Sequence, residues 1–296
     1  MPSNTLSGIS LDVIADKTLD VLSSRFFEFS QFTRDFSDDI KEKGESVKTR
    51  IPGSVSAVNL DNGFVAQNSV TTEKTISLNH YRGYIVGLKD KEVSYAGDLE
   101  WLENILIKPA INATIQKVCD DVLALVTSTA FPTALTVTAT DFDSDDLSTA
   151  AATLSNNKVP KSLRSALIGF DYFSSLQKDT LHITPANAYG SPDAIQNHDA
   201  RLVHGIGVTG YEGIPDNGEN LTGIVCHPSA LLIAARTPAL PTGPRVESAN
   251  RVTEQGLPIQ IRRWYSRNLG LYKMSIGILY GVQTGSPSSL VRIKSS

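Results

Sequence analysis

The stretch "AGDLEWLENILIKPAINATIQKVCDDVLALV", residues 96–126, sets the fold of this chain. Its apolar residues recur every three or four positions, which is the spacing of one face of an α-helix. They are Leu99, Leu102, Leu106, Ile111, Ile115, Val118, Val122 and Leu125. Asp98 stands before them and has a side chain that can cap a helix start. About thirty residues at ~1.5 Å each give a rod of ~45 Å, which is long for a globular protein. We therefore expect one long helix that begins near Asp98.

Pro109 lies inside this helical stripe. Proline has no amide hydrogen to donate, and its ring clashes with the preceding turn of a helix. The sequence therefore predicts that the long helix bends or divides at Pro109, and it gives this residue a structural role.

Residues 47–95, before the helix, have the pattern of strands. Apolar and polar residues alternate in "TTEKTISLNHYRGYIVGLKDKEV", residues 71–93, and a turn-prone Asp-Asn-Gly precedes them. The turn and the residue after it, Asp61, Asn62, Gly63 and Phe64, mark the tip of a long β-ribbon. A two-stranded ribbon has too little core to be stable in water, so we expect it to lie on another surface.

The first 46 residues predict an acidic arm. Residues 10–36 show mixed three- and four-residue apolar spacing, typical of one or two amphipathic helices, and "SDDIKEKGES" then breaks the pattern. Residues 1–46 contain nine acidic and five basic residues, which accounts for the whole net charge of -4. The remaining chain is neutral, which disfavours a protein whose main task is to neutralise phosphates.

The region after the long helix alternates between strands and helices. Residues 165–169 read as a strand that leads into a helix, and residues 221–226 read as a second strand, with a helix expected from Pro228 to Arg236. From Gly256 onward the pattern is strand-like to the end. The class is α+β, with a mixed α/β middle and a C-terminal sheet.

Gly205, Gly207 and Gly210 have the G-x-G-x-x-G spacing of a dinucleotide-binding turn. That turn works only where a strand leads into a helix, whose N-terminus faces the pyrophosphate. Here "YEGIPDNGENLTG" follows, with glycines and a proline in place of a helix. We therefore expect the three glycines to serve a strand and a turn, with no cofactor.

The acidic stretch at residues 141–146 resembles a calcium loop only superficially. An EF-hand loop that began at Asp141 would need glycine at its sixth position and glutamate at its twelfth, and the chain has Asp146 and Ala152 there. A helix N-terminus, which favours carboxylates, is the better interpretation.

Other chemical signatures are missing from the sequence. The five histidines form no H-x-x-x-H pair, no serine stands in G-x-S-x-G, and Cys119 and Cys226 form no C-x-x-C pair. The N-terminus has no signal-peptide pattern, and no apolar run approaches the ~18 residues of a membrane span. We expect no catalytic residue, metal or cofactor, and a protein made in a cytoplasm.

The order of these elements resembles a tailed-bacteriophage major capsid protein of the short-tailed-phage type, with the Hong Kong 97-like fold. The resemblance rests on the ribbon followed by residues 96–126, and on "HGIGVTGYEGIPDNGENLTGIVCHPSALLIAAR", residues 204–236. It implies an N-terminal arm (1–46), an extension loop (47–95) over a neighbouring subunit, a peripheral domain with the spine helix (96–139 and 251–296) and an axial domain (140–250).

The same resemblance implies the function and the partners. The protein would self-assemble into hexamers and pentamers of an icosahedral shell around double-stranded DNA, contacted non-specifically, in a virion formed in the host cytoplasm. A separate scaffolding protein and a portal would take part, but no membrane. Two alternatives stay open: an encapsulin-type nanocompartment shell and, from another class, a nucleotide-dependent oxidoreductase built around Gly205, Gly207 and Gly210.

Overall fold

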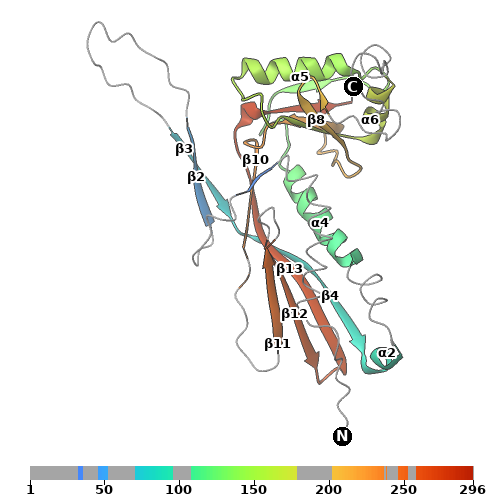
Figure 1. Cartoon of the computed structure of the whole chain (residues 1–296). Helices are drawn as coiled ribbons and strands as arrows, with labels where there is room; N and C mark the ends of the chain where they lie inside the picture. Colours follow the sequence, from blue (N-terminus) through green and yellow to red (C-terminus); the bar gives the residue numbers. More distant parts are fainter. Residues whose placement is uncertain are drawn as a thin grey trace, which may run out of the picture.

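Two β-sheets, one above the other in Figure 1, form the body of the protein. The structure is a computed structural model that describes residues 33–35, 46–52, 71–95, 108–178, 202–236, 238, 246–252 and 258–295. We call the lower β-sheet in Figure 1 the long sheet and the upper β-sheet the short sheet.

The long sheet has the strand order β1-β10-β13-β12-β11, and β4 also pairs with β13. Its strands are β1 (Thr33–Asp35), β4 (His80–Lys89), β10 (Leu231–Arg236), β11 (Val246–Val252), β12 (Pro258–Ser266) and β13 (Leu271–Thr284). Among the described strands of this sheet, β1 and β10 are the only parallel neighbours. Residues 80–89, which were expected in the ribbon, belong to this sheet in the structure. The short helix α2 (Asp90–Tyr95), which the sequence did not predict, follows β4.

The short sheet has the order β5-β14-β9-β6-β8-β7 and mixes parallel and antiparallel pairs. Its strands are β5 (Ala134–Thr136), β6 (Ser165–Ile168), β7 (Leu202–Val203), β8 (Ile206–Gly210), β9 (Leu221–Cys226) and β14 (Leu290–Lys294). Helices α5 (Ser144–Asn156) and α6 (Phe170–Gln177) share a core with one face of it. The strand–helix unit predicted at residues 165–177 is confirmed.

Helix α4 (Lys108–Leu123) joins both sheets through one core. Four residues of the predicted stripe, Ile111, Ile115, Val118 and Val122, are at most 6% exposed, whereas Leu125, after the end of α4, is partly buried. They pack with Ile276 and Ile278 of the long sheet and, in the same cluster, Leu167 of the short sheet. Residues 96–107, where the helix was expected to begin, lie outside the described residues.

The helix predicted from Pro228 to Arg236 is wrong. Residues 231–236 are strand β10, entered through a turn in which the Ala230 amide donates to the His227 carbonyl. Every residue from Leu231 to Ala235 is buried, because odd positions pack into the α4 core and even positions pack under the ribbon. A continuous apolar run buried on both faces carries no periodicity that separates strand from helix.

The acidic stretch begins helix α5, as the sequence predicted. The Asp143 carboxylate accepts hydrogen bonds from the amides of Asp145 (2.9 Å) and Asp146 (3.3 Å). The Asp146 carboxylate in turn accepts a hydrogen bond from the Asp143 amide. This capping box satisfies amides that a helix start leaves free. Burial raises the pKa of Asp146. No cluster of metal-ligating side chains occurs among the described residues.

Candidate assembly surfaces

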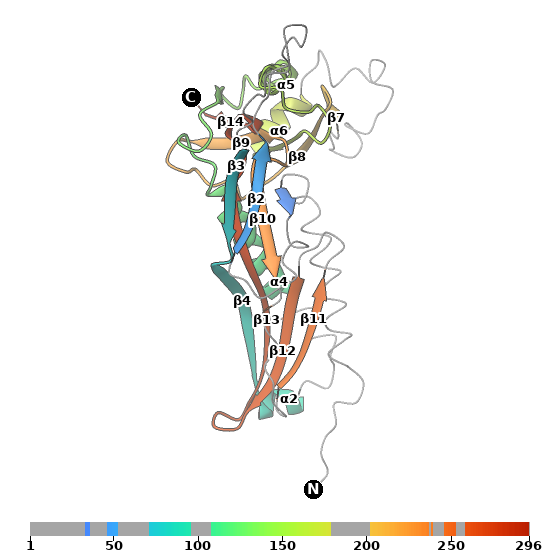
Figure 2. The ribbon, with the colours of Figure 1, turned by 90° about the vertical axis from the view of Figure 1, so that its left-hand side faces the viewer.

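A two-stranded ribbon of β2 (Ser46–Pro52) and β3 (Thr71–Ser77) lies beside β10 (Figure 2). Val47 and Ile76, which pair in the ribbon, are 7% and 0% exposed. They form a small cluster with Leu232 and Ala234 of β10. Near Val47 and Ile76 the ribbon therefore packs on β10 of its own chain, so it lies on another surface as the sequence predicted. The predicted tip, Asp61 to Phe64, lies outside the described residues.

The ribbon crosses the long sheet at a glycine. A side chain at Gly281 of β13 would place its Cβ 2.1 Å from the Ser77 carbonyl oxygen, at the last residue of β3. Real Cβ atoms do not come so close, so only glycine allows the two backbones to approach here. The crossing fixes where the ribbon leaves the body.

A polar cluster around Asp121 of α4 lies next to this crossing. The Tyr280 hydroxyl donates to the Asp121 carboxylate at 2.7 Å, and Lys117 Nζ lies 2.9 Å from its other oxygen. His80 Nδ1 and Arg82 Nε of β4 lie 3.6 and 3.8 Å from Asp121 Oδ2, the oxygen that accepts from Tyr280. The His80 ring also stacks on Tyr280, with centroids 5.3 Å apart. The cluster therefore ties the helix to the first residues of β4.

Opposing effects act on the titration of the Asp121 cluster. Burial would raise the pKa of Asp121, but hydrogen bonds from Tyr280 and Lys117 outweigh it and leave the pKa lowered. Burial, with the Asp121 hydrogen bond, raises the pKa of Tyr280. Asp121 is therefore charged near neutral pH, and Tyr280 keeps the proton that it donates.

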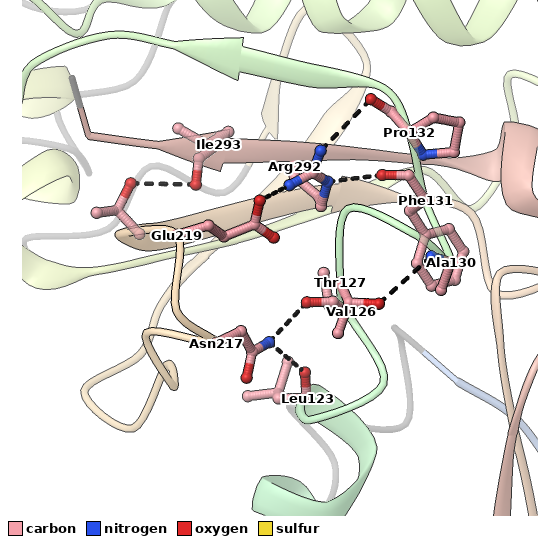
Figure 3. A network of polar contacts seen from close by, with 11 residues as sticks. Leu123, Val126, Thr127, Ala130, Phe131, Pro132, Asn217, Glu219, Arg292 and Ile293 are labelled. Atoms are coloured by element: carbon pink, nitrogen blue, oxygen red, sulfur yellow. Dashed lines mark hydrogen bonds and ion pairs between the residues drawn. The ribbon is translucent and has the colours of Figure 1, made fainter.

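A second polar network ties the short sheet to the end of α4 (Figure 3). Arg292 of β14, 4% exposed, pairs with Glu219 and donates from Nε to the Phe131 carbonyl at 2.6 Å. Asn217 donates to the carbonyls of Leu123 (3.0 Å) and Val126 (2.6 Å). These carbonyls belong to the end of α4 and the turn after it, where a helix lacks internal partners. The network therefore fixes the angle between helix and short sheet.

One face of the long sheet is open to solvent. Strand residues alternate between faces, and His80 and Arg82 point to α4 because they contact Asp121. Tyr81 and Ile85 therefore point away from α4, and they are 54% and 62% exposed. Tyr84, which lies on the α4 face like Arg82, is 50% exposed as well, so exposed apolar side chains occur on both faces of this part of the sheet. Such side chains are typical of an interaction surface.

The three glycines of the dinucleotide-like motif lie in a strand and a turn. His204 and Gly205 connect β7 to β8 with φ of 49° and 78°, and positive φ at both positions is typical of a type I′ hairpin turn. Gly207 and Gly210 lie in β8, and a Cβ at Gly210 would come within 3.0 Å of the Phe170 ring. The described residues 211–236 contain no helix after this turn. The motif therefore lacks the helix that a pyrophosphate needs.

Pro109 is the second residue of the described helix α4. Proline is tolerated in the first turn of a helix, where amides have no internal partner. Its predicted role in bending a longer helix remains a prediction, because the preceding residues lie outside the described part.

No described helix is long and apolar enough to cross a membrane.

Comparison of the sequence with family models finds no match, and no curated protein is significantly similar in sequence. The fold, in contrast, matches solved structures along nearly the whole chain. A structure from Mycobacterium phage Che8 is 15% identical, with a TM-score of 0.65 and 90% of each chain covered. The capsid of cyanophage P-SCSP1u is 15% identical, with a TM-score of 0.62, and the match covers 90% of this chain and 88% of that one.

A virus-like particle from Pyrococcus furiosus also matches, with 13% identity, a TM-score of 0.53 and coverage of 96% of this chain and 99% of that one. Identities this low show only that the fold is shared. That fold is the one that the sequence predicted. The two sheets, the helix between them and the ribbon at their side are the fold of bacteriophage capsid proteins.

Proposed function

We propose that this chain is a major capsid protein, many copies of which form the closed shell around a phage genome. The observation that carries the proposal is the match to phage capsid subunits over nine-tenths of both chains. Such coverage means that the shared fold accounts for nearly the whole of this sequence. The ribbon and the open face of the long sheet support it, because both are liabilities in a monomer and interfaces in a shell.

The four parts of the chain take their roles from this proposal. Residues 1–46 would be the arm, 47–95 the extension loop with its tip at Asp61 to Phe64 and its last strand, β4, in the long sheet, 96–139 with 251–296 the peripheral domain, and 140–250 the axial domain. The ribbon base supports the second role, because Val47 and Ile76 anchor it on β10. The long helix would be the spine of the peripheral domain.

The partners follow from the same proposal. The chain would form hexamers and pentamers with itself, assisted by a scaffolding protein and a portal, and would contact packaged DNA non-specifically. It would assemble in the host cytoplasm and remain in the virion, without an enzymatic activity, metal or cofactor.

Electron microscopy and light scattering of the expressed protein, alone and with the scaffold gene from the same genome, test the proposal. We expect closed particles of uniform diameter. A monomer that stays monodisperse at high concentration in both preparations would contradict it.

The Pyrococcus furiosus virus-like particle favours a second candidate, a shell that holds protein cargo. The contents of purified particles separate the two. Nuclease-protected DNA supports the phage capsid, and co-purified protein without nucleic acid supports the compartment.

Removal of residues 59–70 tests the extension loop. Because the anchoring pair Val47 and Ile76 remains, we expect a circular dichroism spectrum and melting temperature like those of the wild type, but no closed particles. Normal particles would show that the tip makes no essential contact between subunits.

A further inference from the structure

The two ends of the short sheet carry opposite charge. Strand β6 is buried, but the segments before and after it contain exposed residues. We call the end where β6 begins, with residues 157–164 and 202–206, the basic end. We call the end where β6 stops, with residues 137–146 and 169–172, the acidic end. Helix α5 lies along the sheet and connects the acidic end to the basic end (Figure 1).

The basic end contains three cations and no acid. Lys158 and Lys161 are exposed, whereas Arg164 is 6% exposed. The Arg164 guanidinium donates to the carbonyls of Val159 (2.6 Å) and Pro160 (2.9 Å), and all its partners are uncharged oxygen atoms. It therefore fixes the loop after α5 without losing its charge to a carboxylate. Among the described residues, none of the three cations forms an ion pair.

The basic end also exposes two leucines. Leu163 and Leu202 are 74% and 70% exposed, the highest values among the large apolar side chains of the described residues. Gly207 of β8 pairs with Leu202, and its amide donates to the carbonyl of Arg164, the residue after Leu163. The two leucines therefore lie at the same end of the sheet, and exposed apolar side chains of this kind are typical of an interaction surface.

The acidic end has five carboxylates and an exposed phenylalanine. The carboxylates are those of Asp141, Asp143, Asp145, Asp146 and Asp171. The ring of Phe142 packs on Tyr172 with centroids 5.3 Å apart, which brings the start of α5 to the start of α6. Phe170, the first residue of α6, is 53% exposed. The described strands that reach this end bring one cation, Lys294 of β14, so the end is strongly negative.

We propose that the basic end of one chain docks on the acidic end of a second copy, so that the copies join head to tail. Leu163 then packs against Phe170 of the second copy, and the lysines of the basic end face the aspartates of the acidic end. The inference rests on the proposed function, because it requires copies in contact. It adds to that function the two surfaces through which neighbouring copies meet.

Spacing and charge show why the contact is made between copies. Helix α5 has 13 residues and spans ~20 Å, so the two ends of one chain are too far apart to touch. Like ends of two copies repel each other, whereas unlike ends attract, and complementary charge fixes which surfaces meet. A contact between two different surfaces repeats from copy to copy, and it closes a ring where the rotation allows.

Double-stranded DNA is the other occupant that the cations of the basic end suggest, because lysine binds phosphate. DNA would leave the acidic end and Phe170 uncovered, and Leu163 and Leu202 offer nothing to a phosphate. A second copy covers the apolar side chains of both ends and pairs their charges at once. The surface therefore favours a second copy.

Disulfide trapping in the full-length chain tests the proposal. With Leu163→Cys and Phe170→Cys in one chain, mild oxidation of assembled particles should give a ladder of covalent multimers on a non-reducing gel. The two positions flank β6, whose four residues span ~10 Å, and the Cα atoms of a disulfide lie within ~7 Å, so one chain cannot form this bond. The natural thiols do not compete, because Cys119 and Cys226 are buried.

Three control chains accompany this experiment. Leu163→Cys alone and Phe170→Cys alone should give no dimers, because like ends do not meet. Leu163→Cys with Leu269→Cys, which is 61% exposed between β12 and β13, should give no multimers either. Dimers from a single variant, multimers from the Leu269 pair, or no multimers from the Phe170 pair would each overturn the proposal.

Charge exchange gives a second test that needs no new thiol. Lys158→Glu with Lys161→Glu should prevent closed particles, and the further changes Asp141→Lys and Asp171→Lys in the same chain should restore them. All four side chains are exposed, so both variants should keep the circular dichroism spectrum of the wild type. Failure of the second pair to restore particles overturns the proposal. Normal assembly of the glutamate variant also overturns it, and a lower DNA content in those particles would assign the lysines to DNA.

The two proposals fail separately. Closed particles without cross-links leave the capsid function intact and overturn the docking. If no closed particles form, the chain with Leu163→Cys and Phe170→Cys is oxidised in solution at high protein concentration. A ladder of multimers then supports the docking without the shell, and its absence overturns the docking as well.

Discussion

The short sheet and the long sheet solve the burial of apolar surface differently. All four residues of β6, at the centre of the short sheet, are buried, because α5 and α6 pack on one face and the α4 core on the other. The long sheet has α4 on one face, while Tyr81 and Ile85 stay exposed on the other. One sheet is finished by the folding of a single chain. The other leaves apolar side chains exposed, which the proposed shell would cover.

The polar networks at the two sheets differ in the same way. Arg292 is 4% exposed and bound by Glu219 and backbone carbonyls. Around Asp121, by contrast, the Arg82 and Lys117 side chains are 46% and 48% exposed. Changes at Arg292 should therefore reduce stability more than changes around Asp121. Changes on the open face of the long sheet, where side chains have few partners, should mainly affect association.

The largest effect is expected at Arg292. Arg292→Met leaves Glu219 partly buried without its partner and the Phe131 carbonyl without its donor, so the free energy of unfolding should fall by ~3–5 kcal/mol. Urea denaturation measures it. Lys294→Met, on the same strand, is the control and should stay within ~0.5 kcal/mol of the wild type. A loss of less than ~0.5 kcal/mol in the free energy of unfolding would contradict the view that the Arg292 network stabilises the short sheet.

A smaller effect is expected at the ribbon crossing. Gly281→Ala forces β3 away from β13, and overpacking of this kind costs ~1–3 kcal/mol. In the Gly281→Ala variant, compared with the wild type, hydrogen exchange should become faster in β3 and change less in β9. Gly87→Ala, which meets nothing within 4 Å, is the control. Equal exchange in both strands would show that the crossing does not anchor the ribbon.

Asp121→Asn should lower stability by ~1–2 kcal/mol at pH 7, since hydrogen bonds to a charged group are stronger than neutral ones. The pKa of Asp121 is lowered in the folded chain, so its stabilising effect is present above its ordinary pKa of 3.8. The effect is lost as the pH falls through the folded value. Wild type and variant should therefore converge in melting temperature as the pH falls below 3.8 and through the lowered pKa of Asp121. A difference that grows with acidity would assign the cluster another role.

The smallest effect on stability is expected on the open face. Ile85→Thr keeps a branched strand residue and removes exposed apolar surface, so the free energy of unfolding should change by less than ~0.5 kcal/mol. Light scattering should nevertheless show slower or incomplete assembly. Val86→Thr, at the buried neighbouring position, is the reverse control: it should cost stability. Unchanged assembly of Ile85→Thr would remove this face from the interface.

The sequence predicted elements with a clear period or a clear turn. The apolar stripe of α4, the unit at residues 165–177 and the C-terminal strands followed from local pattern alone. The run at residues 231–236 did not, because full burial removes the alternation that identifies a strand.

The polar networks had no local signal in the sequence. Arg292 stands inside an apolar strand, "LVRIK", and its partner Glu219 is 73 residues earlier. Asp121 follows Asp120 on a helix, which suggests a solvated pair, and Tyr280 is 159 residues away. Such contacts depend on the packing of distant elements, which a pattern in one segment cannot contain.

Strand β13 has a consequence for synthesis on the ribosome. It pairs with β4, β10 and β12, and β14, six residues after it, stands between β5 and β9. Neither sheet can close until residues 271–294 have emerged, and translation at ~5–20 residues per second makes the earlier chain wait for them. A nascent or truncated chain therefore cannot display the finished open face of the long sheet, and in the proposed shell only complete chains would be added.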